Sequence, residues 1–277
     1  MFYTEKFGES MKKDRVTRFE IHLNRKDMNS GRFKIAFLSD LHNCKWDAKN
    51  DRLVDLILNE KADLVLCGGD MTVAHPGACD DEALSLIRRV SNEQKVYYAL
   101  GNHEYRLRLY PETYGDRYEK YIESLMKMNV CVLDNKKEDV FAGNIPVSIY
   151  GLSIERRFYK RFSAEKMSTG YIDSMIGKPD DKMINILLAH TPKYMETYMR
   201  WGADLSFSGH YHGGVMRIGK NRGLISPDPS FFPYNAHGYF ERENRFEIIS
   251  AGLGEHTIPV RLNNPRELVV AEVFINR

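Results

Sequence analysis

Short apolar runs and amphipathic segments alternate along most of this chain. Residues 15–23 alternate between polar and apolar side chains, which is typical of a strand with one buried face. After them come short, nearly continuous apolar runs, which are typical of strands buried on both faces. We therefore predict strands at residues 15–23, 34–39, 62–67, 95–100, 129–133, 147–152, 184–189 and 204–207.

Segments with apolar residues at helical spacing separate most of these strands. We predict helices at residues 49–60, 80–93, 113–128, 164–176 and 193–201, and further strands near 215–218, 245–250 and 267–275. Strands that alternate with helices favour a largely parallel sheet with helices outside it. Because no repeat, low-complexity tract or linker interrupts the pattern, we predict one domain over residues 1–277, with its core at about 15–275.

Side chains that bind metals follow five of the predicted strands. The five motifs are Asp40-Leu41-His42, Gly68-Gly69-Asp70, Gly101-Asn102-His103-Glu104, Ala189-His190 and Gly209-His210-Tyr211-His212. In open sheets of this kind, ligands gather beyond the carboxyl ends of the strands. We therefore expect these scattered side chains to meet at one edge of the fold.

The motifs supply enough oxygen and nitrogen donors for two divalent cations. The candidate ligands are Asp40, His42, Asp70, Asn102, His190, His210 and His212. Imidazoles combined with carboxylates suit Mn, Fe, Zn or Co better than Ca or Mg, which favour shells of oxygen alone. Two such ions activate water and neutralise phosphoryl oxygens, so the set predicts attack on phosphorus.

His103 is the remaining histidine of these motifs. It adjoins Asn102, and a histidine changes its charge near neutral pH, so we predict that His103 is the general acid for the leaving group. Glu104 either orients His103 or faces solvent. Taken alone, each motif is more often structural. Their joint occurrence in order, with five of the nine histidines inside them, favours a site.

Composition narrows the class of protein. The chain of 277 residues has 43% hydrophobic and 28% charged residues and a net charge of +2, so its overall charge gives no strong signal for nucleic acid. No apolar segment approaches the length of a membrane span, and residues 1–13 lack the features of a secretory signal. The four cysteines show no metal-site or disulfide spacing. We expect a cytoplasmic protein.

Together the motifs resemble those of the calcineurin-like metallophosphoesterase superfamily over roughly residues 15–275. The resemblance implies an α/β fold: a four-layer α/β/β/α sandwich of two mixed sheets with outer helices, and a metal site at the carboxyl ends of the strands. It also implies two divalent transition-metal ions, Mn, Fe or Zn. On that pattern Asp40, His42 and His212 serve one ion, Asp70 bridges, and Asn102, His190 and His210 serve the other.

Two stretches resemble bacterial phosphodiesterases related to pyrophosphatases of lipid precursors of the UDP-diacylglucosamine type. One is residues 37–42; the other is the tail, residues 251–254 with 264–268. Many proteins of that subgroup have a hydrophobic anchor or export signal at the N-terminus, and from residues 1–13 we expect none in this chain. Many also have Thr and Gln where this chain has Tyr211 and Val215, positions that supply no metal ligand.

Three segments are candidates for the wall of a substrate pocket. They are residues 105–118, rich in Tyr and Arg, the basic and aromatic run 156–162, and the aromatic, proline-rich run 226–239. The run 156–162 could hold a phosphate, stack a base, touch an anionic membrane surface or simply be a solvated loop. We expect residues 226–239 to pack against the second sheet, with stacking on a ligand as the less favoured alternative.

The sequence thus predicts a hydrolase of phosphate esters that depends on two metal ions. We expect a phosphodiesterase or pyrophosphatase that acts on a small phosphorylated substrate, with a metal-bridging hydroxide as nucleophile and His103 as general acid. Three alternatives stay open: a phosphomonoesterase such as a phosphoprotein phosphatase, a nuclease, and a scaffold of this fold that has no catalytic activity. The sequence leaves the oligomeric state open.

Overall fold

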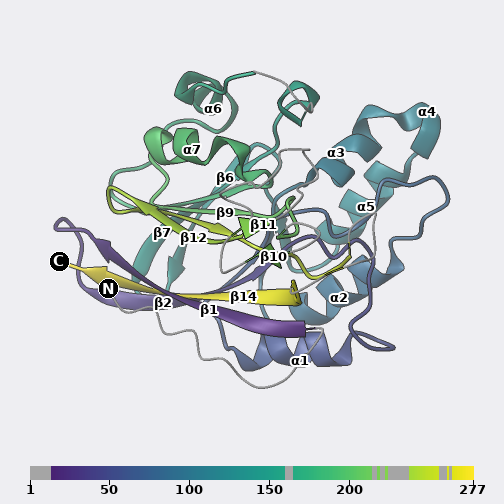
Figure 1. The fold of residues 1–277 in the computed structure, drawn as a ribbon, viewed down its shortest axis with the longest axis horizontal. Helices are drawn as coiled ribbons and strands as arrows, with labels where there is room; N and C mark the ends of the chain where they lie inside the picture. Colours follow the sequence, from purple (N-terminus) through teal and green to yellow (C-terminus); the bar gives the residue numbers. More distant parts are fainter. Residues whose placement is uncertain are drawn as a thin grey trace.

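The computed structural model describes residues 14–159, 165–213, 217–218, 222–223, 237–255, 261 and 264–277. Two six-stranded sheets dominate the described part of the chain. In Figure 1 the two sheets lie across the middle of the molecule, with α6 and α7 on one side and α1 and α2 on the other. Each sheet is mixed, because antiparallel strands border a parallel centre.

The first sheet, here called sheet A, contains the first and the last strand of the described chain, which pair with each other. Its strands, in spatial order, are β1 (Asp14–Asn24), β14 (Arg266–Asn276), β2 (Gly31–Leu38), β3 (Leu64–Cys67), β4 (Val96–Tyr98) and β5 (Val130–Val132). Strands β2 to β5 are parallel, so the segments after β2, β3 and β4 emerge at the same edge.

The second sheet, sheet B, also has a parallel centre, with one antiparallel strand at each edge. Its strands, in spatial order, are β12 (Gly238–Arg242), β13 (Arg245–Ile249), β9 (Leu205–Ser208), β8 (Ile184–Ala189), β7 (Ile145–Leu152) and β6 (Lys136–Ala142). Its four central strands are parallel. A short ribbon pairs β10 (Arg217–Ile218) with β11 (Arg222–Gly223).

Short helices connect the strands. They are α1 (Asp51–Asn59), α2 (Asp81–Ser91), α3 (Asn102–Leu109), α4 (Pro111–Tyr114), α5 (Arg117–Met126), α6 (Thr169–Ile176) and α7 (Met195–Trp201), with 3-10 turns η1 (Arg156–Tyr159) and η2 (Pro192–Tyr194). Among the described residues, no helix is long and apolar enough to cross a membrane. All four cysteines are free.

Three hydrophobic clusters separate the layers. The cluster between the sheets includes Phe37 and Phe207, whose rings lie 5.1 Å apart. A second packs sheet A against α1, α2 and α5, and a third packs sheet B against α6 and α7. The order of layers is therefore helix, sheet, sheet, helix. The predicted α/β/β/α sandwich is confirmed.

The region after β4 differs from the sequence prediction. Residues 105–118, predicted as a loop, lie mostly in α3 and α4, and the predicted helix 113–128 is interrupted at Gly115, where φ is 60°. Helix α3 escaped detection because it has no apolar stripe: it buries only Glu104 and Leu107. Strands β6 and β12 were also missed. Both are edge strands rich in charged side chains.

The other two predicted wall segments are described in part. Residues 156–159 form η1, while residues 160–162 lie outside the described residues. Residues 226–236 also lie outside them, and residues 238–239 begin β12. Tyr239 stacks on Phe19 and packs with a tilted ring against Phe246 of sheet B, at the edge of the core between the sheets, so this end of the segment packs as expected.

Candidate metal centre

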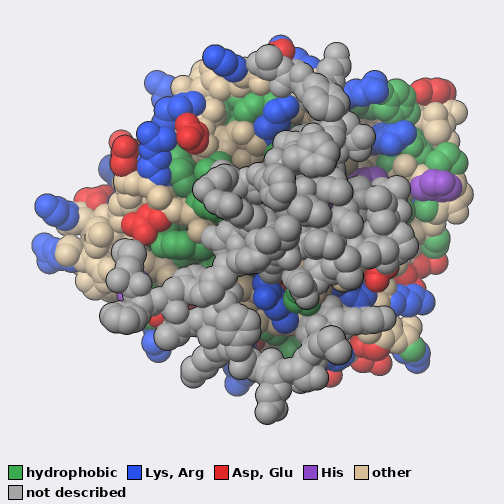
Figure 2. All heavy atoms as spheres, viewed as in Figure 1, with side chains coloured by type: hydrophobic (Ala, Val, Ile, Leu, Met, Phe, Trp, Pro, Cys, Tyr) green, Lys and Arg blue, Asp and Glu red, His purple; other side chains and the backbone are tan. Residues whose placement is uncertain are grey.

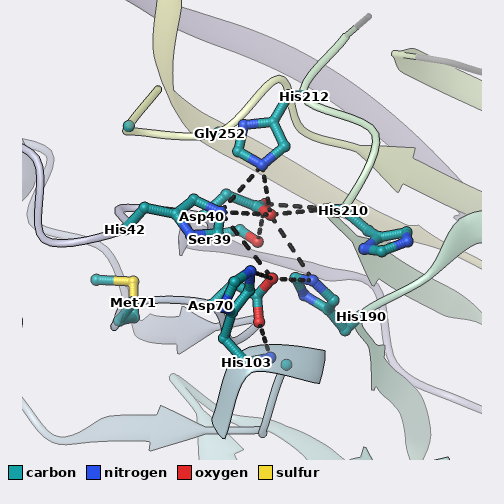
Figure 3. A network of polar contacts seen from close by, with 12 residues as sticks. Ser39, Asp40, His42, Asp70, Met71, His103, His190, His210, His212 and Gly252 are labelled. Carbon is teal, nitrogen blue, oxygen red and sulfur yellow. Dashed lines mark hydrogen bonds and ion pairs between the residues drawn. The ribbon is translucent and has the colours of Figure 1, made fainter. Parts of the chain in front are cut away.

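The five polar motifs meet where the parallel strands of the two sheets end. Asp40, Asp70 and Asn102 follow β2, β3 and β4 of sheet A, while His190 and His210 follow β8 and β9 of sheet B. Figure 3 shows histidines from both sheets around the carboxylates of Asp40 and Asp70. This arrangement agrees with the expectation from the sequence that these side chains lie close together.

One group of possible ligands consists of Asp40, His42 and His212, whose ligand atoms lie within 4.8 Å of one another. The Nε2 atoms of His42 and His212 are 3.0 Å apart, and Nε2 of His212 lies 3.4 Å from Oδ1 of Asp40. The two imidazole rings stack at 4.9 Å. This group brings together the first and last motifs of the sequence.

A second group consists of Asp70, His190 and His210, again within 4.8 Å. Nε2 of His190 lies 3.0 Å from Oδ2 of Asp70 and 3.7 Å from Oδ1 of Asp40. Nδ1 of His190 lies 2.8 Å from the carbonyl oxygen of Gly68, which can only accept a hydrogen bond. In the neutral ring, the proton therefore sits on Nδ1, which leaves Nε2, the nitrogen that faces the carboxylates, as the atom that could bind a metal.

Asn102 and His103 flank the second group at the start of α3. The Oδ1 atom of Asn102 is buried and has no hydrogen-bond partner among the described residues, which is unusual for a buried polar atom. Nε2 of His103 lies 3.9 Å from Oδ2 of Asp70, and its ring meets that of His42 edge-on at 4.9 Å. The structure thus brings all eight predicted site residues to one region.

Five of these residues have a left-handed backbone. Their φ angles are 54° for Asp40, 50° for His42, 52° for Asp70, 66° for His210 and 49° for His212. Residues other than glycine avoid this region, at a cost of order 1–3 kcal/mol each. Such strain persists only where surrounding contacts enforce it, and it concentrates at functional sites.

Glycines make room for the two carboxylates. A Cβ atom on Gly209 would lie 1.9 Å from Oδ2 of Asp40, and one on Gly101 would lie 2.2 Å from Oδ1 of Asp70. Because these glycines have no Cβ atom, the carboxylates can approach the backbone. The N–H of His210 donates to Oδ1 of Asp40 at 3.0 Å, and the N–H of His103 donates to Oδ1 of Asp70 at 2.7 Å. Gly209, directly before His210, and Gly101, two residues before His103, are therefore part of the site.

Glu104 has a role that the sequence analysis missed. Its side chain is fully buried, and its carboxylate accepts hydrogen bonds from the backbone N–H groups of Asp70, Met71 and Gly101 at 2.9–3.0 Å. The Tyr98 hydroxyl also donates to it, at 2.7 Å. Both predicted alternatives for Glu104 were wrong: it neither faces solvent nor contacts the His103 ring, and instead holds two motif loops together.

The charges of the cluster are strongly coupled. Burial raises the pKa of Asp40 to about 6, and the charge of Asp70 adds to this effect. Burial also raises the pKa of Asp70, but His190, His103 and His42 outweigh it and hold that pKa well below its usual value. For His190, burial lowers the pKa, yet the two carboxylates raise it to about 10. Two buried carboxylates thus require positive charge nearby.

The donor set fits a pair of divalent ions. Two carboxylates lie side by side among five imidazoles, and among the described residues no donor bonds to the Asn102 oxygen. Mixed nitrogen and oxygen donors of this kind suit Mn, Fe, Zn or Co. Two of the three groups of possible ligands have the composition that the resemblance implies, and the third combines His42 and Asp70 with His103, the predicted acid. Which residue binds which ion stays a prediction.

Comparison with known proteins gives the family. A family model described as calcineurin-like phosphoesterase matches residues 33–214, which is more than half of the chain. This chain belongs to the calcineurin-like phosphoesterase family. Membership confirms the predicted class, a metallophosphoesterase, and implies divalent metal ions as cofactors. The subgroup related to lipid-precursor pyrophosphatases stays a prediction.

Individual relatives are distant. An uncharacterized metallophosphoesterase of Helicobacter pylori is 25% identical over 96% of this chain and 66% of its own length. The Escherichia coli protein named phosphodiesterase YaeI is 24% identical over 69% of this chain and 64% of its own length. The chain thus spans about two thirds of these relatives. The solved Haemophilus influenzae NAD nucleotidase (NadN) is similar with a TM-score of 0.50 at 15% identity, over 81% of this chain and 46% of that one; this likeness shows the fold alone.

Proposed function

We propose that the protein is a phosphodiesterase that depends on two divalent metal ions and acts on a small phosphorylated substrate. The observation that carries this proposal is the convergence of Asp40, Asp70 and their histidines at the common edge of both sheets, with His103 beside Asp70. The name of the Escherichia coli relative supports a diester substrate. Pyrophosphate bonds are the second substrate class that this site suits.

The residues of the chain would divide the work between holding ions and handling protons. Asp40, His42 and His212 would hold one ion, Asn102, His190 and His210 the other, and Asp70 both. Bound there, the ions would supply a more acidic water and neutralise the phosphoryl oxygens. The Gly68 carbonyl orients His190, and Glu104 orients the backbone that carries Asp70 and Asn102.

His103 would serve the leaving group. Because the backbone N–H of Ala74 donates to Nδ1 of His103 at 2.8 Å, the proton of the neutral ring sits on Nε2, on the side of Asp70. His103 thus presents Nε2–H, the hydrogen-bond donor of its neutral ring, to an oxygen that departs from phosphorus, and full proton transfer to that oxygen requires the protonated ring. An alkoxide is a poor leaving group, so the protein needs such a donor more for alkyl esters than for aryl esters.

Tyr159 is the best candidate for a substrate contact within the predicted wall segments. It ends η1, and its ring meets that of His210 edge-on at 5.5 Å. Its side chain is half-buried, and its hydroxyl has no hydrogen bond among the described residues. Burial raises the pKa of Tyr159 well above its usual value, and the charge of Asp70 raises it further, so the hydroxyl stays a donor. We infer that it donates to the substrate phosphate.

The test is metal binding together with diester hydrolysis. Protein freed of metal by chelation should bind two Mn²⁺ per chain and then hydrolyse bis(p-nitrophenyl) phosphate. Asp70→Asn should lose both properties together, because it removes the shared carboxylate. Wild-type protein that folds but neither binds Mn²⁺ nor hydrolyses diesters would contradict the proposal. That result would favour the alternative of a scaffold without catalytic activity.

A nuclease and a phosphomonoesterase are the rival enzymes. On the face drawn in Figure 2, basic and acidic side chains are mixed over the described surface, and the net charge of the chain is only +2. Neither observation favours DNA, which selects basic surfaces. The rivals predict hydrolysis of oligonucleotides or of p-nitrophenyl phosphate in preference to small diesters, so the same metal-loaded protein can be assayed on all three.

A further inference from the structure

The connection from β13 to β14 crosses from sheet B to sheet A beside the metal centre. It contains residues 251–254, one of the two tail stretches that the sequence analysis singled out. At the sheet B end, the backbone N–H of Ser250 donates to the carbonyl of Ser208 at 2.9 Å. At the sheet A end, Leu253 donates to the carbonyl of Ser39 at 2.9 Å and Gly254 to that of Asp40 at 2.7 Å.

The 251–254 segment also fits tightly against Asp40. A Cβ atom on Gly252 would lie 2.8 Å from Cβ of Asp40, and Gly252 has a φ of 79°. The two hydrogen bonds from Leu253 and Gly254 fix the peptide groups on either side of the Asp40 Cα atom. They therefore enforce the left-handed backbone of Asp40, which aims its carboxylate at the site.

Glu267, at the start of β14, holds this segment from behind. Its side chain is fully buried, and its Oε1 atom accepts the backbone N–H of Ala251 at 2.7 Å. Its own backbone N–H donates to the carbonyl of Gly252 at 3.0 Å. Main chain and side chain of one residue thus grip two consecutive residues of the segment that contacts Asp40.

The carboxylate of Glu267 is itself held by side chains from elsewhere. Thr17 Oγ1 donates to its Oε2 atom at 2.6 Å, and Nη2 of Arg15 forms an ion pair with it at 3.0 Å. Nε2 of His237 lies 2.8 Å from Oε1. A buried carboxylate is expensive unless so many donors surround it. Pairing of β1 with β14 needs only backbone hydrogen bonds, so the charge points to a further role.

We propose that Glu267 is a positioning residue for Asp40. By holding residues 251–254, it keeps Asp40 in its left-handed conformation and so raises the affinity of the centre for the ion that Asp40 binds. This inference rests on the proposed function, which makes Asp40 a metal ligand. It predicts that the tail of the chain affects metal binding without contacting the metal.

The experiment is a titration of metal-free protein with Mn²⁺, monitored by calorimetry and by the electron paramagnetic resonance signal of free Mn²⁺. Glu267→Gln keeps the shape but replaces one acceptor oxygen with an NH₂ group that faces N–H donors. One of the two Mn²⁺ sites should weaken by about tenfold or more, the size usual for residues that support metal ligands. The other site should keep its affinity.

Two control variants lie on the same strand. Glu272→Gln removes a part-exposed carboxylate that faces Arg32, and it should leave both Mn²⁺ affinities unchanged. Val273→Ala removes buried methyl groups from the core between the sheets, so it should destabilise the fold without lowering the affinity for Mn²⁺. Comparing it with Glu267→Gln separates positioning from general loss of stability.

Gly252→Ala tests the same route without changing a charge and serves if Glu267→Gln does not fold. The added Cβ atom pushes on Asp40, so the Mn²⁺ affinity of the same single site should fall. Because both changes act through Asp40, the variant that combines Glu267→Gln with Gly252→Ala should lose no more affinity than the more damaging of the two changes alone. Two Mn²⁺ bound with wild-type affinity in both variants, or equal weakening in Val273→Ala, overturns the inference and leaves the proposed function intact. Wild-type protein that binds no Mn²⁺ contradicts the proposed function itself.

Discussion

The backbone N–H of Ala74 donates a hydrogen bond of 2.8 Å to Nδ1 of His103. This contact fixes the ring and leaves Nε2 as its proton donor, 3.9 Å from Asp70. The position of the proton follows from chemistry, because a backbone amide can only donate. The first prediction depends on this relationship between a loop residue and a motif histidine.

His103→Ala should lower turnover by about 10²–10⁴-fold on diesters with an alkoxide leaving group, because the departing oxygen then lacks a proton donor. Turnover on p-nitrophenyl esters should fall much less, since p-nitrophenolate leaves without a proton. Steady-state kinetics on both substrates, with Mn²⁺ content measured in parallel, checks this. An equal loss on both substrates, with Mn²⁺ retained, would remove the acid role.

Glu104→Gln should reduce both stability and metal affinity. The carboxylate receives three backbone N–H groups and the Tyr98 hydroxyl, and an amide can accept with only one of its two ends. Leaving buried donors unpaired costs about 1–3 kcal/mol. Urea unfolding of the metal-free protein and a Mn²⁺ titration measure the two effects. The exposed Glu112→Gln on α4 is the control, and a Glu104 variant as stable as that control would contradict the assigned role.

The sequence predicts the strands and the polar motifs well because both depend on local patterns. Nearly continuous apolar runs marked β3 and β8, and the residues that follow them bear the site. Helix α3 has no such pattern. Its start is held by Glu104, whose carboxylate accepts the N–H of Gly101 three residues earlier, as in one half of a capping box. The Gly-x-x-Glu spacing was the signal that could have revealed it.

Other features of the site depend on contacts between distant segments. Gly209 contacts Asp40 across 169 positions, and Gly252 contacts the same residue from the far end of the chain. Nothing local in the sequence shows that a side chain at either glycine would strike a carboxylate. The role of Glu267 is hidden for the same reason, because its partner Thr17 lies 250 positions away on β1 and its partner Ala251 lies in the connection from β13 to β14.

Tyr159→Phe should lower kcat/KM for diesters by about tenfold or more, the size expected for a hydrogen bond to a charged group. The fold should be unaffected, since the hydroxyl has no hydrogen bond among the described residues. Inhibition by inorganic phosphate should weaken in parallel, which separates a phosphate contact from a change in the metal centre. Tyr239→Phe is the matched control, because the hydroxyl of Tyr239 contacts Glu241 instead. Unchanged kinetics and unchanged phosphate inhibition would exclude the contact.

Glu247 predicts how stability depends on pH. It lies on β13, is fully buried and contacts the hydroxyls of Ser206 and Ser208 on β9. Burial raises its pKa from 4.5 to about 7, although the two hydroxyls lower it in part. Between these two values, the folded protein keeps a proton that the unfolded chain releases. The contribution of Glu247 to the free energy of unfolding is therefore fully present below pH 4.5 and is lost as the pH rises through about 7.

The free energy of unfolding attributable to Glu247 should fall by about 3 kcal/mol over that interval, at 1.36 kcal/mol per pKa unit. Glu247→Gln, which mimics the protonated form, should abolish this slope and be the more stable protein at pH 8. Urea unfolding of metal-free wild type and variant from pH 4.5 to 8 measures the difference, with Glu241→Gln on β12 as an exposed control. Parallel curves for wild type and Glu247→Gln would show that Glu247 is already ionised in the folded protein, because only a carboxyl that stays protonated inside the sheet can release its proton on unfolding.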